Sequence, residues 1–181
     1  RGNQIATNGF RRVELAVSLC YPLLVKVQRV YVDTSVIGGC FDAEFERWSN
    51  GLFRDFRLGI FKPVTSDLVA AEVADAPPQV VAKFEELLTY GPQFLEVTAQ
   101  AIELATLYGT RGILTPHYFN DGLHIALATI AEVDVLVSWN FKHIVHMNKI
   151  RLFNAVNLGQ GYRSIEIYSP REVTTYDEEE S

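Results

Sequence analysis

Val30-Tyr31-Val32-Asp33 is the stretch of sequence that decides the fold. Three consecutive β-branched or aromatic residues predict a short strand that is buried on both faces. Such strands are typical of parallel sheets, in which helices cover both faces. Asp33 follows the strand directly, and ligands of open parallel sheets bind beyond the carboxyl ends of the strands. The stretch therefore predicts both a central strand and a candidate functional residue.

Strands and helices alternate along the chain beyond Asp33. Further strands are predicted over residues 61–65, 94–97, 133–137 and 165–167, and helices over residues 41–56, 67–75, 80–90, 99–108 and 115–131. Ser66, Thr98 and Thr115 stand where hydroxyl side chains cap helix N-termini. This order predicts an α/β fold, a three-layer α/β/α sandwich with a mainly parallel central sheet.

The length and composition fit one domain with two distinct ends. The chain has 181 residues, of which 48% are hydrophobic, so disorder is excluded for most of it. We expect an N-terminal extension without assigned function over residues 1–28, partly helical over 13–19. The folded domain is expected over 29–175, and a solvated acidic tail over 176–181.

Charge, apolar patterning and cysteine content exclude several classes of protein. The net charge is −6, and four negative charges lie at 177–180, so a strongly basic nucleic-acid-binding protein is excluded, although a local basic patch is not. The apolar stretch 13–27 contains Glu14, Pro22 and Lys26, which argues against a membrane span, and no convincing signal-peptide cleavage site follows it. Cys20 and Cys40 form no disulfide framework, which fits the cytoplasm.

Three acidic residues are candidates for a metal site. Asp33 follows a strand, Glu72 lies within an apolar helical stretch, and Asp121 begins the apolar helical run 121–128, in which an aspartate has poor helix propensity. Asp33 alone is explained equally well as a helix cap, and Glu72 alone as an exposed helix residue. Buried carboxylates are costly unless they are paired or bind a metal, so three together favour a divalent cation.

Asn140 follows the predicted strand 133–137 closely. Its side chain could supply an amide oxygen, hold a water or cap the next helix.

The segments that carry these residues are Tyr31-Val32-Asp33-Thr34-Ser35-Val36-Ile37, Ser66-Asp67-Leu68 with Glu72, Asp121-Gly122-Leu123-His124-Ile125-Ala126, and Val137-Ser138-Trp139-Asn140-Phe141-Lys142-His143. In order and spacing they resemble the motifs of the PIN domain, and within that superfamily the chain is similar to the VapC-type toxins of bacterial toxin–antitoxin pairs. The resemblance covers residues 29–167.

The resemblance implies a Mg²⁺- or Mn²⁺-dependent endoribonuclease, a hydrolase whose substrate is RNA. It assigns the metal and the catalysis to Asp33, Glu72 and Asp121, and gives Ser35 a supporting role behind the first acid. Many members carry a fourth acid where this chain has Asn140, so a second metal site should be weaker here. Oxygen ligands suit Mg²⁺ or Mn²⁺ rather than zinc, and such an ion activates a water and neutralises the leaving oxygen. The resemblance also implies a cognate antitoxin and a homodimer.

Residues near Asn140 are candidates for binding RNA. Lys142, Lys149 and Arg151 could contact the phosphate backbone, although ordinary surface cations explain them equally well. His143 and His146 are spaced to share a helical face, and we interpret them as an ordinary surface pair.

One histidine and three aromatic residues are interpreted as parts of the hydrophobic core. We expect His124 to be a hydrogen-bonded core residue, and Trp48, Phe53 and Phe56 to be core rather than a base-stacking surface. The aromatic helix 41–56 offers more apolar surface than one core needs, which favours the homodimer.

Two alternatives to the nuclease remain open. The first is a PIN-fold binding module with little or no catalysis, because the fourth acid is missing. The second is a haloacid-dehalogenase-like phosphatase, suggested by Asp33-Thr34-Ser35. That pattern requires a second aspartate where this chain has Ser35, so the second alternative is the weaker one.

Overall fold

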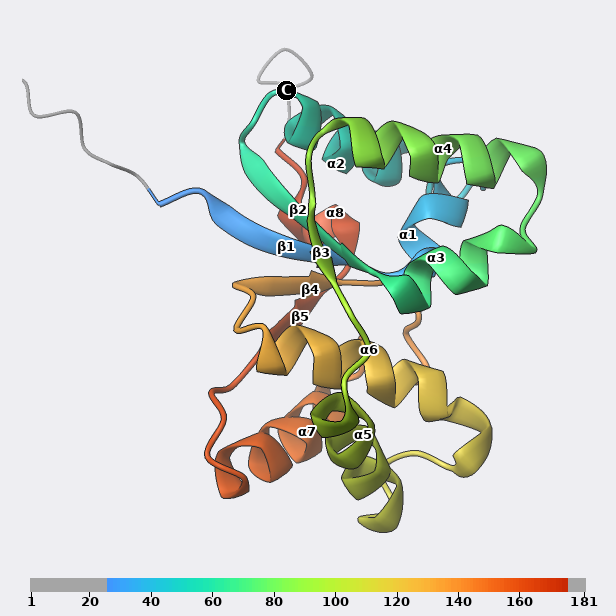
Figure 1. The fold of residues 1–181 in the computed structure, drawn as a ribbon. Coiled ribbons are helices and arrows are strands. Elements are labelled where there is room, and N and C mark those ends of the chain that lie inside the picture. Colours follow the sequence, from blue (N-terminus) through green and yellow to red (C-terminus); the bar gives the residue numbers. More distant parts are fainter. Residues whose placement is uncertain (1–25, 176–181) are drawn as a thin grey trace, which may run out of the picture.

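A computed structural model describes residues 26–175 of the chain (Figure 1). The elements in order are β1 (Gln28–Val32), α1 (Thr34–Gly39), α2 (Glu46–Arg57), β2 (Phe61–Ser66), α3 (Asp67–Ala74), α4 (Pro78–Thr89), β3 (Gln93–Leu95), α5 (Ala99–Thr110), the 3₁₀ turn η1 (Pro116–Tyr118), α6 (Phe119–Ile130), β4 (Val135–Val137), α7 (Met147–Gly159), β5 (Glu166–Tyr168) and α8 (Pro170–Val173).

The five strands form one sheet in the order β3-β2-β1-β4-β5, and every neighbouring pair is parallel. β1 is the central strand, because Tyr31 is paired with Val64 of β2 on one side and with Leu136 of β4 on the other. Val30, Tyr31 and Val32 are fully buried. The predicted α/β sandwich is confirmed, and the sheet is parallel throughout rather than mainly so.

Helices cover both faces of the sheet (Figure 1). Helices α1 to α4 lie on one face, and α5, α6 and α7 lie on the other, while α8 packs against α2. The carboxyl ends of β1, β2 and β4 meet at one edge of this sandwich because the strands are parallel. This edge carries the candidate site.

The capping prediction is confirmed at two helices and wrong at the third. Ser66 accepts a hydrogen bond from the Val69 amide, and Thr98 accepts one from the Ala101 amide. Thr115 makes no such side-chain bond, because η1 intervenes and α6 begins only at Phe119. Asp121 therefore lies in the first turn of α6, where the helix dipole favours an acid, and not in the middle of a helix.

The aromatic stretch 41–56 is buried mainly towards its C-terminal end. Helix α2 begins at Glu46, and Phe53 and Phe56 are buried, which confirms their assignment to the core. Trp48 is only partly buried, whereas Phe41, which precedes the helix, is 44% exposed. The stretch therefore leaves less apolar surface free than the sequence pattern suggested.

The remaining predictions concern the two cysteines, the N- and C-terminal segments of the chain and the absence of a membrane span. Cys40 is a buried free thiol. The predicted helix 13–19, Cys20 and the acidic tail lie outside the described residues. Within residues 26–175 no helix is long and apolar enough to cross a membrane.

Candidate functional site

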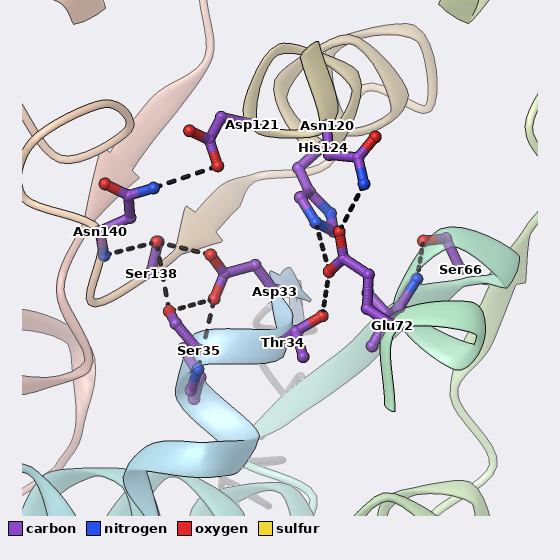
Figure 2. Close-up of polar contacts among 12 residues, drawn as sticks. Asp33, Thr34, Ser35, Ser66, Glu72, Asn120, Asp121, His124, Ser138 and Asn140 are labelled. Atoms are coloured by element: carbon purple, nitrogen blue, oxygen red, sulfur yellow. Dashed lines mark hydrogen bonds and ion pairs between the residues drawn. The ribbon is translucent and has the colours of Figure 1, made fainter. Parts of the chain in front are cut away.

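Asp33 lies at the carboxyl end of β1 and is held from three directions (Figure 2). Ser35 Oγ donates to Oδ1 at 2.6 Å, and Ser138 Oγ donates to Oδ2 at 2.6 Å. The amide of Val36 donates to Oδ1, so Asp33 also caps α1. Burial raises the pKa of Asp33, against the opposing effects of the His124 charge and of these hydrogen bonds. The supporting role expected of Ser35 thus has a direct geometric basis.

Glu72 reaches the same edge from α3 and accepts three hydrogen bonds. Thr34 Oγ1 donates to Oε2, Asn120 Nδ2 donates to Oε1 at 3.0 Å, and His124 Nε2 lies 3.1 Å from Oε2. Burial alone would raise the pKa of Glu72, but the hydrogen bond and charge of His124, together with the other two donors, lower it to about 2. Glu72 is therefore ionised at neutral pH.

His124 connects Glu72 with the core of the sheet. Its Nδ1 lies 2.9 Å from the Tyr31 hydroxyl, which in turn lies 2.8 Å from Ser66 Oγ. An ionised carboxylate only accepts hydrogen bonds, so His124 Nε2 must be the donor to Glu72. The prediction of a hydrogen-bonded core histidine is confirmed, since His124 is 3% exposed.

Asp121 and Asn140 form the third part of the site. Asn140 Nδ2 donates to Asp121 Oδ1 at 3.1 Å, while Asn140 Oδ1 accepts from the His143 amide at 2.9 Å. The amide nitrogen, rather than the amide oxygen, thus faces the acid. Burial raises the pKa of Asp121, and the charge of Glu72 adds to this, while His124, Asn140 and Lys149 oppose it.

Hydrogen bonds connect the surroundings of the three carboxylates at this edge: Thr34, next to Asp33, donates to Glu72, and the segment that donates to Asp33 through Ser138 donates to Asp121 through Asn140 (Figure 2). We call Asp33, Glu72 and Asp121 the acidic site. A carboxylate has about four lone-pair positions, and Asp33 and Glu72 each accept three of the hydrogen bonds given above, so each retains capacity for a cation. No group of three or more His, Cys, Asp or Glu side chains within residues 26–175 is arranged to hold a metal ion.

The donor chemistry of the acidic site nevertheless fits Mg²⁺ or Mn²⁺. Both are hard ions that take oxygen ligands, and Mg²⁺ usually keeps several waters and binds one or two carboxylates directly. The acidic site offers carboxylate oxygens and no sulfur ligand. The assignment of the metal to all three acids remains a prediction.

Comparison with solved structures gives a match that covers 78% of this chain and 98% of the other, with a TM-score of 0.50 and 15% sequence identity. The matching chain comes from the crystal structure of VapBC2 from Rickettsia felis bound to a DNA fragment from their promoter. The fold is PIN-like. No protein-family model matches the chain, and no curated protein matches it.

In this PIN-like fold, one of the three predicted RNA-binding cations, Lys149, is close to an acid of the candidate site. Lys142 Nζ lies 5.8 Å from the centre of the Tyr118 ring, and Lys149 Nζ lies 3.0 Å from His143 Nδ1. Lys149 is also close enough to Asp121 to lower its pKa. Arg151 is exposed on α7, two residues beyond Lys149.

The prediction that His143 and His146 form a surface pair is wrong for His143. His143 lies in the turns before α7 and is 8% exposed, because its ring stacks on Tyr118 at 3.6 Å. His146 is the N-cap residue of α7, so the two do not share a helical face. Burial lowers the pKa of His143, and the charges of Lys149 and Lys142 lower it further.

The sequence singled out the three acids of the candidate site but not most of the groups that donate hydrogen bonds to them. Thr34, Asn120 and Ser138 were not singled out, and His124 was expected as a hydrogen-bonded core residue without Glu72 as its partner. One signal was available, because Asn120 and His124 are four residues apart and therefore share a helical face.

Proposed function

We propose that this chain is a metal-dependent endoribonuclease that cleaves phosphodiester bonds of RNA, and that it is the toxin of a toxin–antitoxin pair. The observation that carries the proposal is that three acids, which follow β1 or lie on α3 and α6, are connected through hydrogen-bonded neighbours at the carboxyl-end edge of a PIN-like sheet. All three acids have shifted pKa values, and such groups are functional candidates.

Asp33, Glu72 and Asp121 would hold Mg²⁺ or Mn²⁺, which supplies an activated water and neutralises charge on the leaving oxygen when it is bound. The hydroxyls of Ser35 and Ser138 keep the carboxylate of Asp33 in one orientation. His124 keeps Glu72 ionised and oriented.

The remaining site residues act on the substrate. The amide nitrogen of Asn140 fixes Asp121 and adds no negative charge, so an RNA phosphate meets less repulsion than it would beside a fourth acid. Lys142, Lys149 and Arg151 attract the phosphate backbone.

The proposed partners are RNA, a cognate antitoxin and a second copy of the chain. An antitoxin that controls this nuclease would place an extended or helical segment over the acidic site. The similar structure contains VapBC2 with promoter DNA, which supports the search for such a partner encoded with this chain.

The test uses the purified full chain with a fluorogenic single-stranded RNA in Mn²⁺ and in EDTA. We expect cleavage that EDTA abolishes and that Asp33→Asn reduces by several orders of magnitude, while a substitution of exposed Glu103 on α5 leaves it unchanged. Cleavage that persists in EDTA would contradict the metal-dependent mechanism.

A binding module without catalysis is the second candidate, and the amide at Asn140 is the observation that favours it. RNA that binds in Mn²⁺ without being cleaved would support this candidate and contradict the nuclease.

A further inference from the structure

His143 is a buried residue whose position relative to Asp121 is fixed by two contacts. Its backbone amide donates to Asn140 Oδ1 at 2.9 Å, and Asn140 Nδ2 donates to Asp121 (Figure 2). Its ring stacks on that of Tyr118 with ring centres 3.6 Å apart, and Tyr118 lies three residues before Asp121. One contact is made by the backbone and the other by the ring, so the whole residue is held beside the third acid of the acidic site.

The ring nitrogen Nδ1 of His143 binds the ammonium group of Lys149, which lies 3.0 Å away. An ammonium group only donates hydrogen bonds, so Nδ1 is the acceptor. Burial lowers the pKa of His143, and the charges of Lys149, Lys142 and His117 lower it further, so the ring is neutral at neutral pH and is able to accept. The charge of Lys149 opposes the rise in the pKa of Asp121 that burial causes. A neutral ring thus holds a cation close to an acid of the site.

This arrangement is unfavourable for the stability of the fold in two ways. A neutral imidazole that accepts at Nδ1 carries its proton on Nε2, and His143 Nε2 is buried without a hydrogen-bond partner among residues 26–175. A buried donor without a partner is costly. Lys149 lies in the first turn of α7, where the helix dipole disfavours a cation. Residues that break two local rules without a gain in stability are candidates for a functional role.

We propose that His143 is a positioning residue that holds the Lys149 ammonium beside Asp121, where Lys149 donates to a phosphate oxygen of RNA at the acidic site. This inference rests on the proposed function and adds to it the residue that prepares one of the cations for the substrate. A long side chain loses conformational freedom when it binds, and the bond to His143 removes part of that cost before the phosphate arrives.

The experiment measures RNA affinity separately from cleavage. A fluorescein-labelled oligoribonucleotide is titrated with the full chain in Ca²⁺, which takes oxygen ligands as Mn²⁺ does, and fluorescence anisotropy gives the dissociation constant. Electrophoresis of the RNA after each titration checks that it is intact. We expect Lys149→Gln to weaken binding by about tenfold, the effect of losing one hydrogen bond from a charged group.

Two variants of His143 separate its acceptor from its packing. His143→Phe keeps a ring that stacks on Tyr118 and removes the acceptor, so it should weaken binding several-fold, by no more than Lys149→Gln does. The double variant should bind like Lys149→Gln alone, because both changes remove the same contact. His143→Asn places its Oδ1 near the position of Nδ1 and should recover part of the affinity.

The matched control is His146→Phe, a change of the exposed histidine at the N-cap of α7, and it should bind RNA like the wild type. Thermal melts check that each variant is folded. His143→Phe should be at least as stable as the wild type, because it removes the unpaired donor and keeps the stacked ring.

The outcomes separate this inference from the proposed function. Unchanged binding by Lys149→Gln or by folded His143→Phe overturns the positioning role, even if Mn²⁺-dependent cleavage by the wild type is intact. A double variant that binds more weakly than Lys149→Gln, or no recovery by folded His143→Asn, overturns it as well. The expected losses of affinity, together with no cleavage by the wild type in Mn²⁺, support the positioning role and contradict the nuclease.

Discussion

Glu72 and Asp121 lie at the same site and have opposite pKa shifts. Three donors surround Glu72 and lower its pKa to about 2, whereas burial and the charge of Glu72 raise the pKa of Asp121, which Asn140 opposes. Negative charge is thus stabilised at Glu72 and is costly at Asp121 in the metal-free chain. Asp121 is the residue at which a bound cation would relieve the most repulsion.

Asp121→Asn should make the metal-free chain at least as stable as the wild type at neutral pH. A raised folded-state pKa means that ionised Asp121 destabilises the fold, and this cost disappears as the pH falls through that pKa towards the ordinary value of 3.8. The gain is expected to be modest, since the helix dipole favours an acid in the first turn by about 0.3–1 kcal/mol. Thermal melts in EDTA measure it.

The same variant should lose Mn²⁺ binding and RNA cleavage. A lower melting temperature at every pH would show instead that Asp121 has a structural role, and normal cleavage would remove it from the site.

Glu72→Gln should destabilise the chain and flatten its acid denaturation. The lowered pKa of Glu72 means that its contribution to stability is fully present above its ordinary value of 4.5 and is lost as the pH falls through about 2. Chemical denaturation between pH 7 and pH 2 measures the loss for the wild type, the variant and the exposed-residue control Glu103→Gln. If the free energy of unfolding depended on pH in the same way for the wild type and for Glu72→Gln, the lowered pKa of Glu72 would be contradicted.

His124→Ala should weaken Mn²⁺ binding by about tenfold to a hundredfold, because residues that orient a ligand affect affinity by this amount. His124→Gln keeps a donor for Glu72 and an acceptor for the Tyr31 hydroxyl, so it should recover part of the affinity. Electron paramagnetic resonance of Mn²⁺ measures the affinity of the chain for the ion independently of RNA cleavage. Unchanged affinity in folded His124→Ala would exclude a positioning role.

At the scale of elements, two adjacent glycines of α1 differ sharply in their surroundings. A Cβ on Gly38 would meet nothing within 4 Å, whereas a Cβ on Gly39 would lie 2.7 Å from Ser49 Oγ and from Trp139 Nε1. Gly39 therefore permits α1 to approach Trp139, whose ring stacks on Phe45.

Gly38→Ala should stabilise the chain by about 0.5–1 kcal/mol, because glycine is less favourable than alanine within a helix. Gly39→Ala should destabilise it by about 1–3 kcal/mol through overpacking and should shift the tryptophan fluorescence. Urea denaturation measures both variants, and equal effects on stability would contradict the packing difference between the two positions.

The sequence predicted those elements that have a local signal, such as an apolar run or a capping hydroxyl. It did not predict elements whose formation depends on tertiary contacts. The strand 30–32 and the caps Ser66 and Thr98 followed from apolar runs and hydroxyl positions. Helix α1 is too short to show a periodicity, and only Phe153 and Asn157 of α7 are buried, so its pattern is weak. The interruption by η1 was also missed, because Thr115-Pro116 starts an α-helix and a 3₁₀ turn equally well.

The same division holds for the site. Each acid could be predicted because it stands at a strand end or in an apolar run, but the donors to Glu72 come from residues up to 52 positions away. Which side chain reaches which oxygen depends on how α3 and α6 cross the sheet. No local pattern contains that information.

At the scale of the whole molecule, the homodimer remains a prediction, and the surface expected to form it has changed. Phe53 and Phe56 are buried and only Phe41 is clearly exposed among the rings over 41–56, whereas α7 exposes its Met147, Leu152 and Leu158 by 51% or more. Exposed apolar groups of this kind favour self-association. Light scattering at micromolar concentrations should give twice the chain mass of 20.4 kDa, and a single species of 20.4 kDa throughout would contradict the dimer.

The central position of β1 has a consequence for synthesis of the chain on the ribosome. β1 is the first strand within residues 26–175, yet Asp33 at its end acquires its Ser138 partner only 105 residues later, and β4 pairs with the side of β1 that β2 leaves open. β1, β2 and β3 with their helices can associate early, because domains are built from the N-terminus as they emerge. The acidic site is completed only when residues 138–140 have left the exit tunnel. On the proposed function, an unfinished polypeptide therefore has no assembled site with which to cut the messenger from which it is being translated.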